Sequence, residues 1–104
     1  MLDQTILDNI ISRIVEVADP ERIILFGSAA RGEMNRHSDV DLLIVKACVH
    51  RRSLARQIRR KLYGVRIAVD VIVVTPEDVE RYKDSHALII KPALQEGTVI
   101  YEAA

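Results

Sequence analysis

The chain has 104 residues, of which 49% are hydrophobic and 29% charged, so we expect one folded domain, residues 1–104, rather than a disordered chain. Its 15 basic and 15 acidic residues cancel, and this balance gives no reason to expect a membrane or nucleic-acid binder. A single cysteine, Cys48, excludes an internal disulfide, and neither a signal peptide nor an apolar run of roughly 18 residues is present, so we expect a cytoplasmic protein.

The first half of the chain predicts a helix and two strands. Apolar residues recur at three- and four-residue steps from about Asp3 to Ala18, the spacing of an amphipathic helix, and Asp19-Pro20 ends it. The apolar run Arg22–Phe26 is typical of a buried strand and closes at Gly27. A second strand is expected from about Asp39 to Lys46, with both faces covered.

The next segment predicts a helix followed by a long strand. Residues from about Val49 to Tyr63 place apolar side chains on one helical face and arginines on the other, and Gly64 ends this helix. The β-rich run Val65–Val74 is interrupted by one carboxylate, Asp70.

The C-terminal part completes an α/β pattern. Thr75-Pro76, followed by acids, is a helix-start signature with threonine as the cap. A further helix from Ser85 to about Glu96 and a strand Thr98–Glu102 follow. This order of elements predicts an α/β domain, a mixed β-sheet flanked by helices.

Three features indicate chemistry, and the first is the turn at Gly27-Ser28. Backbone N–H groups at such a turn bind anions such as phosphates, and glycine permits a close approach. The hydroxyl of Ser28 adds a donor, and Arg31 adds a charge-assisted one. An ordinary strand-ending turn is the alternative.

The second and third features are carboxylates. Asp39 and Asp41 are two apart on a strand, so they face the same space, and paired hard oxygen ligands suit Mg²⁺ beside substrate phosphates. The alternative is a solvated pair. We expect Asp70 to be buried in mid-strand, where an unpaired carboxylate costs several kcal/mol and needs a partner. That partner is either a metal shared with Asp39 and Asp41 or an ion pair with Arg66.

These residues together resemble a known family. The segments 27–32 (GSAARG), 38–45 (SDVDLLIV) and 69–71 (VDV) resemble the motifs of the DNA polymerase β-like nucleotidyltransferase superfamily. More specifically, the chain resembles the minimal nucleotidyltransferases that act as antitoxins beside HEPN-domain toxins. The resemblance covers nearly the whole chain and implies the polymerase β-like fold.

The resemblance also implies roles for individual residues. Gly27-Ser28 would hold the nucleotide triphosphate, with Arg31 as a further phosphate contact. Asp39, Asp41 and Asp70 would bind two Mg²⁺ ions, and Asp70 would accept the proton of the attacking hydroxyl. ATP would be the substrate.

The expected function is transfer of AMP to a tyrosine of a cognate HEPN toxin, within a homo- or hetero-oligomer. One alternative is a binding antitoxin that occludes its partner, using the apolar stretch 87–90. Another is nucleotide addition to an RNA end held by a stripe of helix arginines, although nucleic acid is not the expected partner. That stripe comprises Arg52, Arg56, Arg59 and Arg60.

Overall fold

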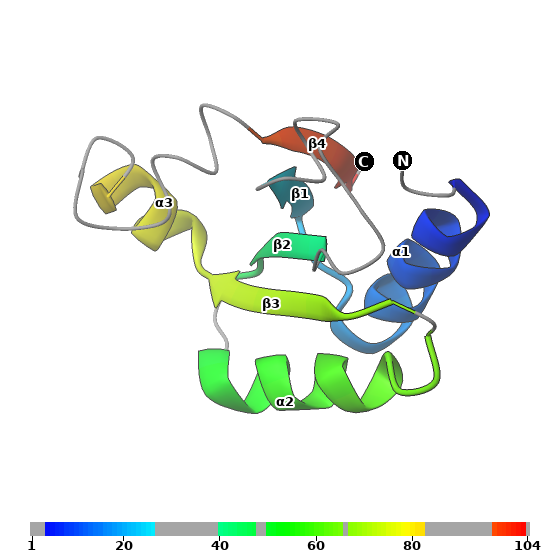
Figure 1. Cartoon of the computed structure of the whole chain (residues 1–104). Helices are drawn as coiled ribbons and strands as arrows, with labels where there is room; N and C mark the ends of the chain where they lie inside the picture. Colours follow the sequence, from blue (N-terminus) through cyan, green and yellow to red (C-terminus); the bar gives the residue numbers. More distant parts are fainter. Residues whose placement is uncertain (1–3, 27–39, 48–49, 66, 83–96, 104) are drawn as a thin grey trace.

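A computed structural model describes residues 4–26, 40–47, 50–65, 67–82 and 97–103. Four strands form one sheet and three helices lie against it (Figure 1). In chain order the elements are α1 Gln4–Ala18, β1 Arg22–Phe26, β2 Val40–Val45, α2 Arg51–Lys61, β3 Val69–Val74, α3 Pro76–Tyr82 and β4 Thr98–Glu102.

The sheet is mixed, as the sequence predicts. Its strand order is β3-β2-β1-β4, with β2 and β3 parallel and the other neighbours antiparallel. Strand β2 is therefore central, and five of its six residues are buried. The register of β1 against β4 shifts between Ile23 and Ile24. Strand β3 lies at an edge, which exposes one side of its backbone ladder.

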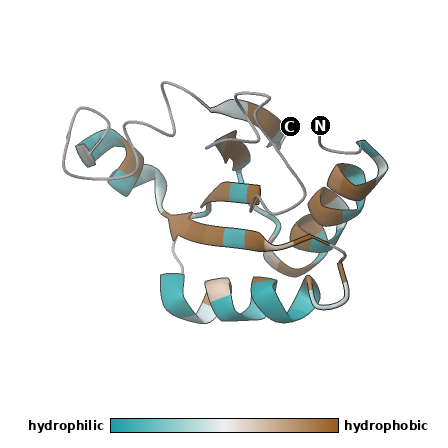
Figure 2. Ribbon diagram, in the orientation of Figure 1, coloured by the Kyte–Doolittle hydropathy of each residue, from teal (hydrophilic) through white to brown (hydrophobic). Residues whose placement is uncertain are grey.

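One face of the sheet packs against α1 and α2 (Figure 1). Ile14 of α1, Ile58 of α2 and Ile44 of β2 are fully buried in this core. Figure 2 shows the strands as mainly hydrophobic and α2 as mainly hydrophilic, because only one stripe of that helix enters the core. Arg13 of α1 joins the two helices by donating to the carbonyl oxygens of Lys61 and Tyr63, at 2.9 and 3.1 Å.

The other face carries a smaller apolar cluster against α3. Ile24, Leu43 and Val74 are buried in it, and Val79 of α3 packs on them. The start of α3 forms as the sequence predicts. The Thr75 hydroxyl accepts from the Asp78 N–H at 3.1 Å, and the Asp78 carboxylate accepts from the Thr75 N–H at 3.0 Å.

Two predicted boundaries differ from the structure. The expected strand Val65–Val74 begins only at Val69, because β3 pairs with β2 and the first pair is Val40 with Val69. The helix expected over Val49–Tyr63 is α2, Arg51–Lys61, and Gly64 follows it with a φ of 91°.

The helix expected from Ser85 to Glu96 lies outside the described residues. Within the described ranges, no helix combines the length and apolar character needed to span a bilayer.

Candidate active site

Asp41 and Asp70 lie side by side on neighbouring strands. They are direct partners in the parallel register of β2 and β3, where adjacent strands run about 4.8 Å apart. Because side chains alternate along a strand, both carboxylates stand on the same face as Leu43 and Ile72, away from α1 and α2. The fold thus brings together two acids that are separated in sequence by the rest of β2 and the whole of α2.

Strand β1 extends the same row across the sheet. Phe26, the last residue of β1, pairs with Asp41, so the row runs Phe26, Asp41, Asp70 from the middle of the sheet to its edge. Gly27 follows Phe26 directly in the chain. The polypeptide therefore leaves β1 for its Gly27-Ser28 segment at the position beside Asp41.

The expectation that Asp70 is buried in mid-strand is wrong. It is the second residue of β3 and is exposed, whereas Asp41 is partly buried. The physical reason is that β3 is an edge strand whose pairing starts at Val69, so β2 alone flanks Asp70 among the strands that the structure describes. The cost of burying a charge therefore does not demand a partner for Asp70. Its place beside Asp41 follows from the register alone.

Adjacent carboxylates make this row suited to a cation. Like charges directly opposite each other on neighbouring strands repel, and a divalent ion between them removes the repulsion. Carboxylate oxygens are the hard ligands that Mg²⁺ takes, usually one or two of them together with substrate phosphates. The donor set of Asp41 and Asp70 therefore fits Mg²⁺.

The remaining predicted site residues lie outside the described residues: Gly27, Ser28, Arg31 and Asp39. Asp39 precedes Val40, the first residue of β2, by one position. Among the described residues, no group of three or more His, Cys, Asp and Glu side chains could hold a metal ion. The structure thus supplies two of the three predicted acids and their relation to each other.

Sequence reasoning missed the place of Phe26 in the row and the hollow beside α2. Phe26 is buried and pairs with Asp41 across the two strands, and in the sequence it is recognisable as the last apolar residue before Gly27. The hollow between α2 and β3 is lined mostly by arginines of the stripe, together with Arg51. The sequence places the stripe on one face of a helix, and nothing in the local pattern predicts that β3 completes a hollow there.

Comparison with known proteins gives a family match over almost the whole chain. Residues 8–104 match the family described as polymerase beta, nucleotidyltransferase. The chain is 31% identical over 90 residues to MJ1305 of Methanocaldococcus jannaschii, a candidate protein adenylyltransferase. That alignment covers 75% of the chain and 61% of the relative, so the chain spans about three fifths of the relative's length.

Solved structures share the fold at low sequence identity. A toxin-antitoxin complex with AMP-PNP matches with a TM-score of 0.62 and 20% identity, over 92% of this chain and 73% of that one. A mutant of the toxin-antitoxin pair MntA-HpeT matches with a TM-score of 0.66 and 13% identity, over 98% of this chain and 75% of that one. The mixed four-stranded sheet with its helices is thus the fold of these proteins.

Proposed function

The chain belongs to the polymerase beta nucleotidyltransferase family, and we propose that it transfers AMP from ATP to a tyrosine hydroxyl of a HEPN-domain toxin. This modification silences the toxin, so the chain is its antitoxin. The observation that carries the proposal is the register pairing of Asp41 with Asp70, which puts two carboxylates next to each other on one face of the sheet. The relatives support a protein as the acceptor of AMP, since one is a candidate protein adenylyltransferase and two similar structures are of toxin-antitoxin complexes.

In this proposal the acids act on both the metal and the attacking group. Asp39, Asp41 and Asp70 would hold two Mg²⁺ ions, whose positive charge would offset that of the triphosphate and of the leaving pyrophosphate. The tyrosine oxygen forms a bond to the α-phosphorus of ATP while the bond to pyrophosphate breaks. Asp70 accepts the tyrosine proton, and its exposure at the sheet edge leaves it accessible to a hydroxyl on another protein.

The triphosphate itself is assigned to the segment after β1. Gly27-Ser28 donates backbone and hydroxyl hydrogen bonds to phosphate oxygens, and Arg31 adds a charged contact. The row that begins at Phe26 supports this assignment, because the segment starts one residue beyond the neighbour of Asp41. An AMP-PNP complex among the structures of the same fold supports ATP as the substrate.

The test is transfer of label from α-³²P-ATP to the purified toxin. We expect wild-type protein to label the toxin in the presence of Mg²⁺, and Asp41→Asn and Asp70→Asn each to lower the rate at least about 100-fold, the usual cost of removing a group that acts on the transition state. Glu77→Gln is the matched control, since it removes an exposed carboxylate on α3 and should label normally.

Absence of label with wild-type protein, or normal labelling by Asp70→Asn, would refute the proposal. A double variant, Asp41→Asn with Asp70→Asn, that still neutralises the toxin at equal stoichiometry would identify occlusion as the mechanism instead. The arginine stripe gives no support to RNA-end addition, because α2 covers the face of the sheet opposite the two acids.

A further inference from the structure

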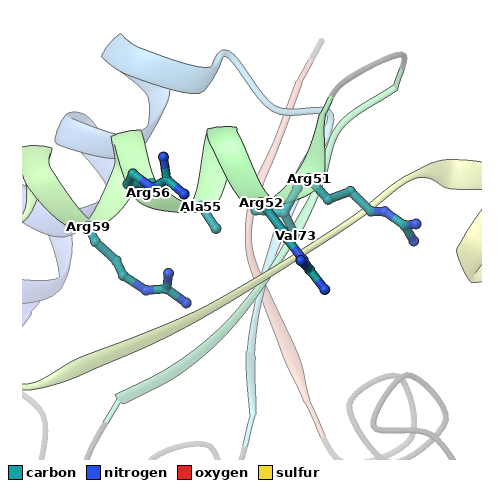
Figure 3. Close-up of a pocket in the computed structure, with 6 residues that line it drawn as sticks. All are labelled: Arg51, Arg52, Ala55, Arg56, Arg59 and Val73. Atoms are coloured by element: carbon teal, nitrogen blue, oxygen red, sulfur yellow. The ribbon is translucent and has the colours of Figure 1, made fainter.

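A basic hollow runs between α2 and the edge strand β3 (Figure 3). It measures about 300 Å³ and adjoins a second hollow of about 450 Å³ that shares some of its lining residues. We refer to the two together as the α2–β3 trough. Its lining residues are His50, Arg51, Arg52, Ala55, Arg56, Arg59 and Val73.

The positive charge of the trough is only partly compensated. Arg51 extends toward α3, where it forms an ion pair with Asp78 at 2.8 Å (Figure 3). Arg59 donates to the backbone carbonyl of Val71 at 3.4 Å, which leaves its charge in place. Within the part of the chain that the structure describes, Arg52 and Arg56 form no ion pair, and both are exposed. The trough is therefore lined by three guanidinium groups whose charge no described carboxylate neutralises, those of Arg52, Arg56 and Arg59.

Helix stability accounts for only some of the charges of α2, since Arg59, Arg60 and Lys61 lie in its last turn, where the helix dipole favours cations. The eleven residues of α2, RRSLARQIRRK, contain six cations and no acid. Arg52 and Arg56 are four apart, as are Arg56 and Arg60, and like charges at this spacing destabilise a helix. Arg51 and Arg52 also oppose the helix dipole at its N-terminal end. A polyanion bound in the trough would offset the repulsion between Arg52 and Arg56 and the unfavourable charges at the N-terminal end of the helix.

The trough is separate from the row of acids. Val73 belongs to the core that packs on α1 and α2, whereas Asp70 alternates to the other face of the same strand. An anion in the trough is consequently not the triphosphate that the two acids would face. It is a second ligand, held on the opposite side of the sheet.

We propose that the α2–β3 trough binds the phosphodiester backbone of a nucleic-acid strand, without sequence preference. Among the described residues, its apolar lining is Ala55 and Val73, and it contains no Phe, Tyr or Trp side chain. The strongest anchors of protein interfaces are aromatic and arginine side chains that pack in a desolvated core, and the trough offers the arginines with little apolar surface around them. Interfaces with phosphates are polar and strongly positive, and they carry no base recognition by themselves.

The helix geometry sets the size of this contact. Arg52 to Arg59 spans seven residues, or about 10 Å at 1.5 Å per residue, so the strand would meet about three guanidinium groups. None of the described lining residues is Phe, Tyr or Trp, so the trough lacks the large aromatic rings on which the bases of single strands usually stack. This proposal does not depend on the AMP-transfer activity.

The test is the salt dependence of binding to a fluorescent single-stranded RNA of mixed sequence, measured by fluorescence anisotropy on the full chain. With three phosphate contacts, the logarithm of affinity should fall with the logarithm of salt concentration with a slope of about −2.1, a loss of about 18-fold between 50 and 200 mM. The double variant Arg52→Gln, Arg56→Gln should lose only about 3-fold over the same range. A DNA strand of the same sequence should bind similarly.

Two further variants separate the trough from general charge. Arg60→Gln changes the same charge on the same helix outside the trough, and it should keep the wild-type slope. Arg52→Lys with Arg56→Lys keeps the cations and should also keep it. The proposal is overturned if Arg60→Gln weakens binding as much as Arg56→Gln, or if wild-type protein does not bind RNA at 50 mM salt. It is also overturned if polyglutamate displaces RNA at equal charge concentration, since the trough would then fit an acidic protein.

Discussion

Replacing Asp70 with asparagine should stabilise the metal-free protein while it removes the proposed activity. Asp41 and Asp70 are register partners on strands about 4.8 Å apart, and Asp70 is exposed, so a dielectric constant near that of water applies. Coulomb's law then gives a repulsion of about 0.9 kcal/mol. Relief of this repulsion in Asp70→Asn should raise the Tm by about 4 to 7 °C for a domain of this size.

The assay is thermal unfolding followed by circular dichroism, with EDTA and then with Mg²⁺. Magnesium at ten times its Kd should stabilise the wild type by about 1.4 kcal/mol, and the variant should gain much less because one ligand is gone. Glu77→Gln serves as the control, since removing an acid from the first turn of α3 should lower stability slightly and leave the Mg²⁺ response unchanged. A lower Tm for Asp70→Asn in EDTA, or an equal Mg²⁺ response, would refute the reasoning.

Three further substitutions test the fold around the site. Leu43 is fully buried in the central strand, so Leu43→Ala should lower the free energy of unfolding in urea by about 2 to 5 kcal/mol. Val99 on β4 is 48% exposed, so Val99→Ala should lower it much less, and equal losses of unfolding free energy would contradict this prediction. Gly64→Ala should destabilise the fold by about 1 kcal/mol or more, because Gly64 has a φ of 91°, which a residue with a Cβ rarely adopts. The added Cβ would meet no atom within 4 Å, so this backbone strain is the whole cost, and Gly64→Asn should cost less. Asp78→Ala should cost about 1 to 2 kcal/mol by removing the cap and the ion pair with Arg51. The hydrogen bond from the Thr75 backbone N–H is the main cause that lowers the pKa of Asp78 below its ordinary 3.8. The stabilisation by Asp78 is therefore complete above pH 3.8 and is lost as the pH falls through the lowered pKa. An unchanged difference in unfolding free energy between wild type and Asp78→Ala at pH 2 would contradict this.

Local patterns predict most elements because their limits are set locally. Arg22–Phe26 and Thr98–Glu102 are strands over the same residues that the sequence predicts, since each is a short apolar or β-branched run with a turn residue at one end. The α/β class and mixed sheet are confirmed as well. The start of α3 is confirmed because Thr75 and Asp78 are close in sequence and form reciprocal hydrogen bonds.

The local sequence pattern does not show which strands pair with each other or where the pairing begins. Val65 to Ala68 has the composition of a strand, yet β3 starts at Val69, where β2 first provides a partner. Asp70 was expected to be buried because its neighbours in sequence are apolar, but exposure depends on β3 being an edge strand. The trough was missed for the same reason, since it needs Val73 of β3 as well as the arginines of α2.

The most direct test of the account is the position of a metal ion in the site. Crystals grown with Mn²⁺ and a non-hydrolysable ATP analogue should give an anomalous peak bonded to carboxylate oxygens of both Asp41 and Asp70. A peak bonded to neither acid, or to only one of them while the nucleotide is bound elsewhere, would contradict the account.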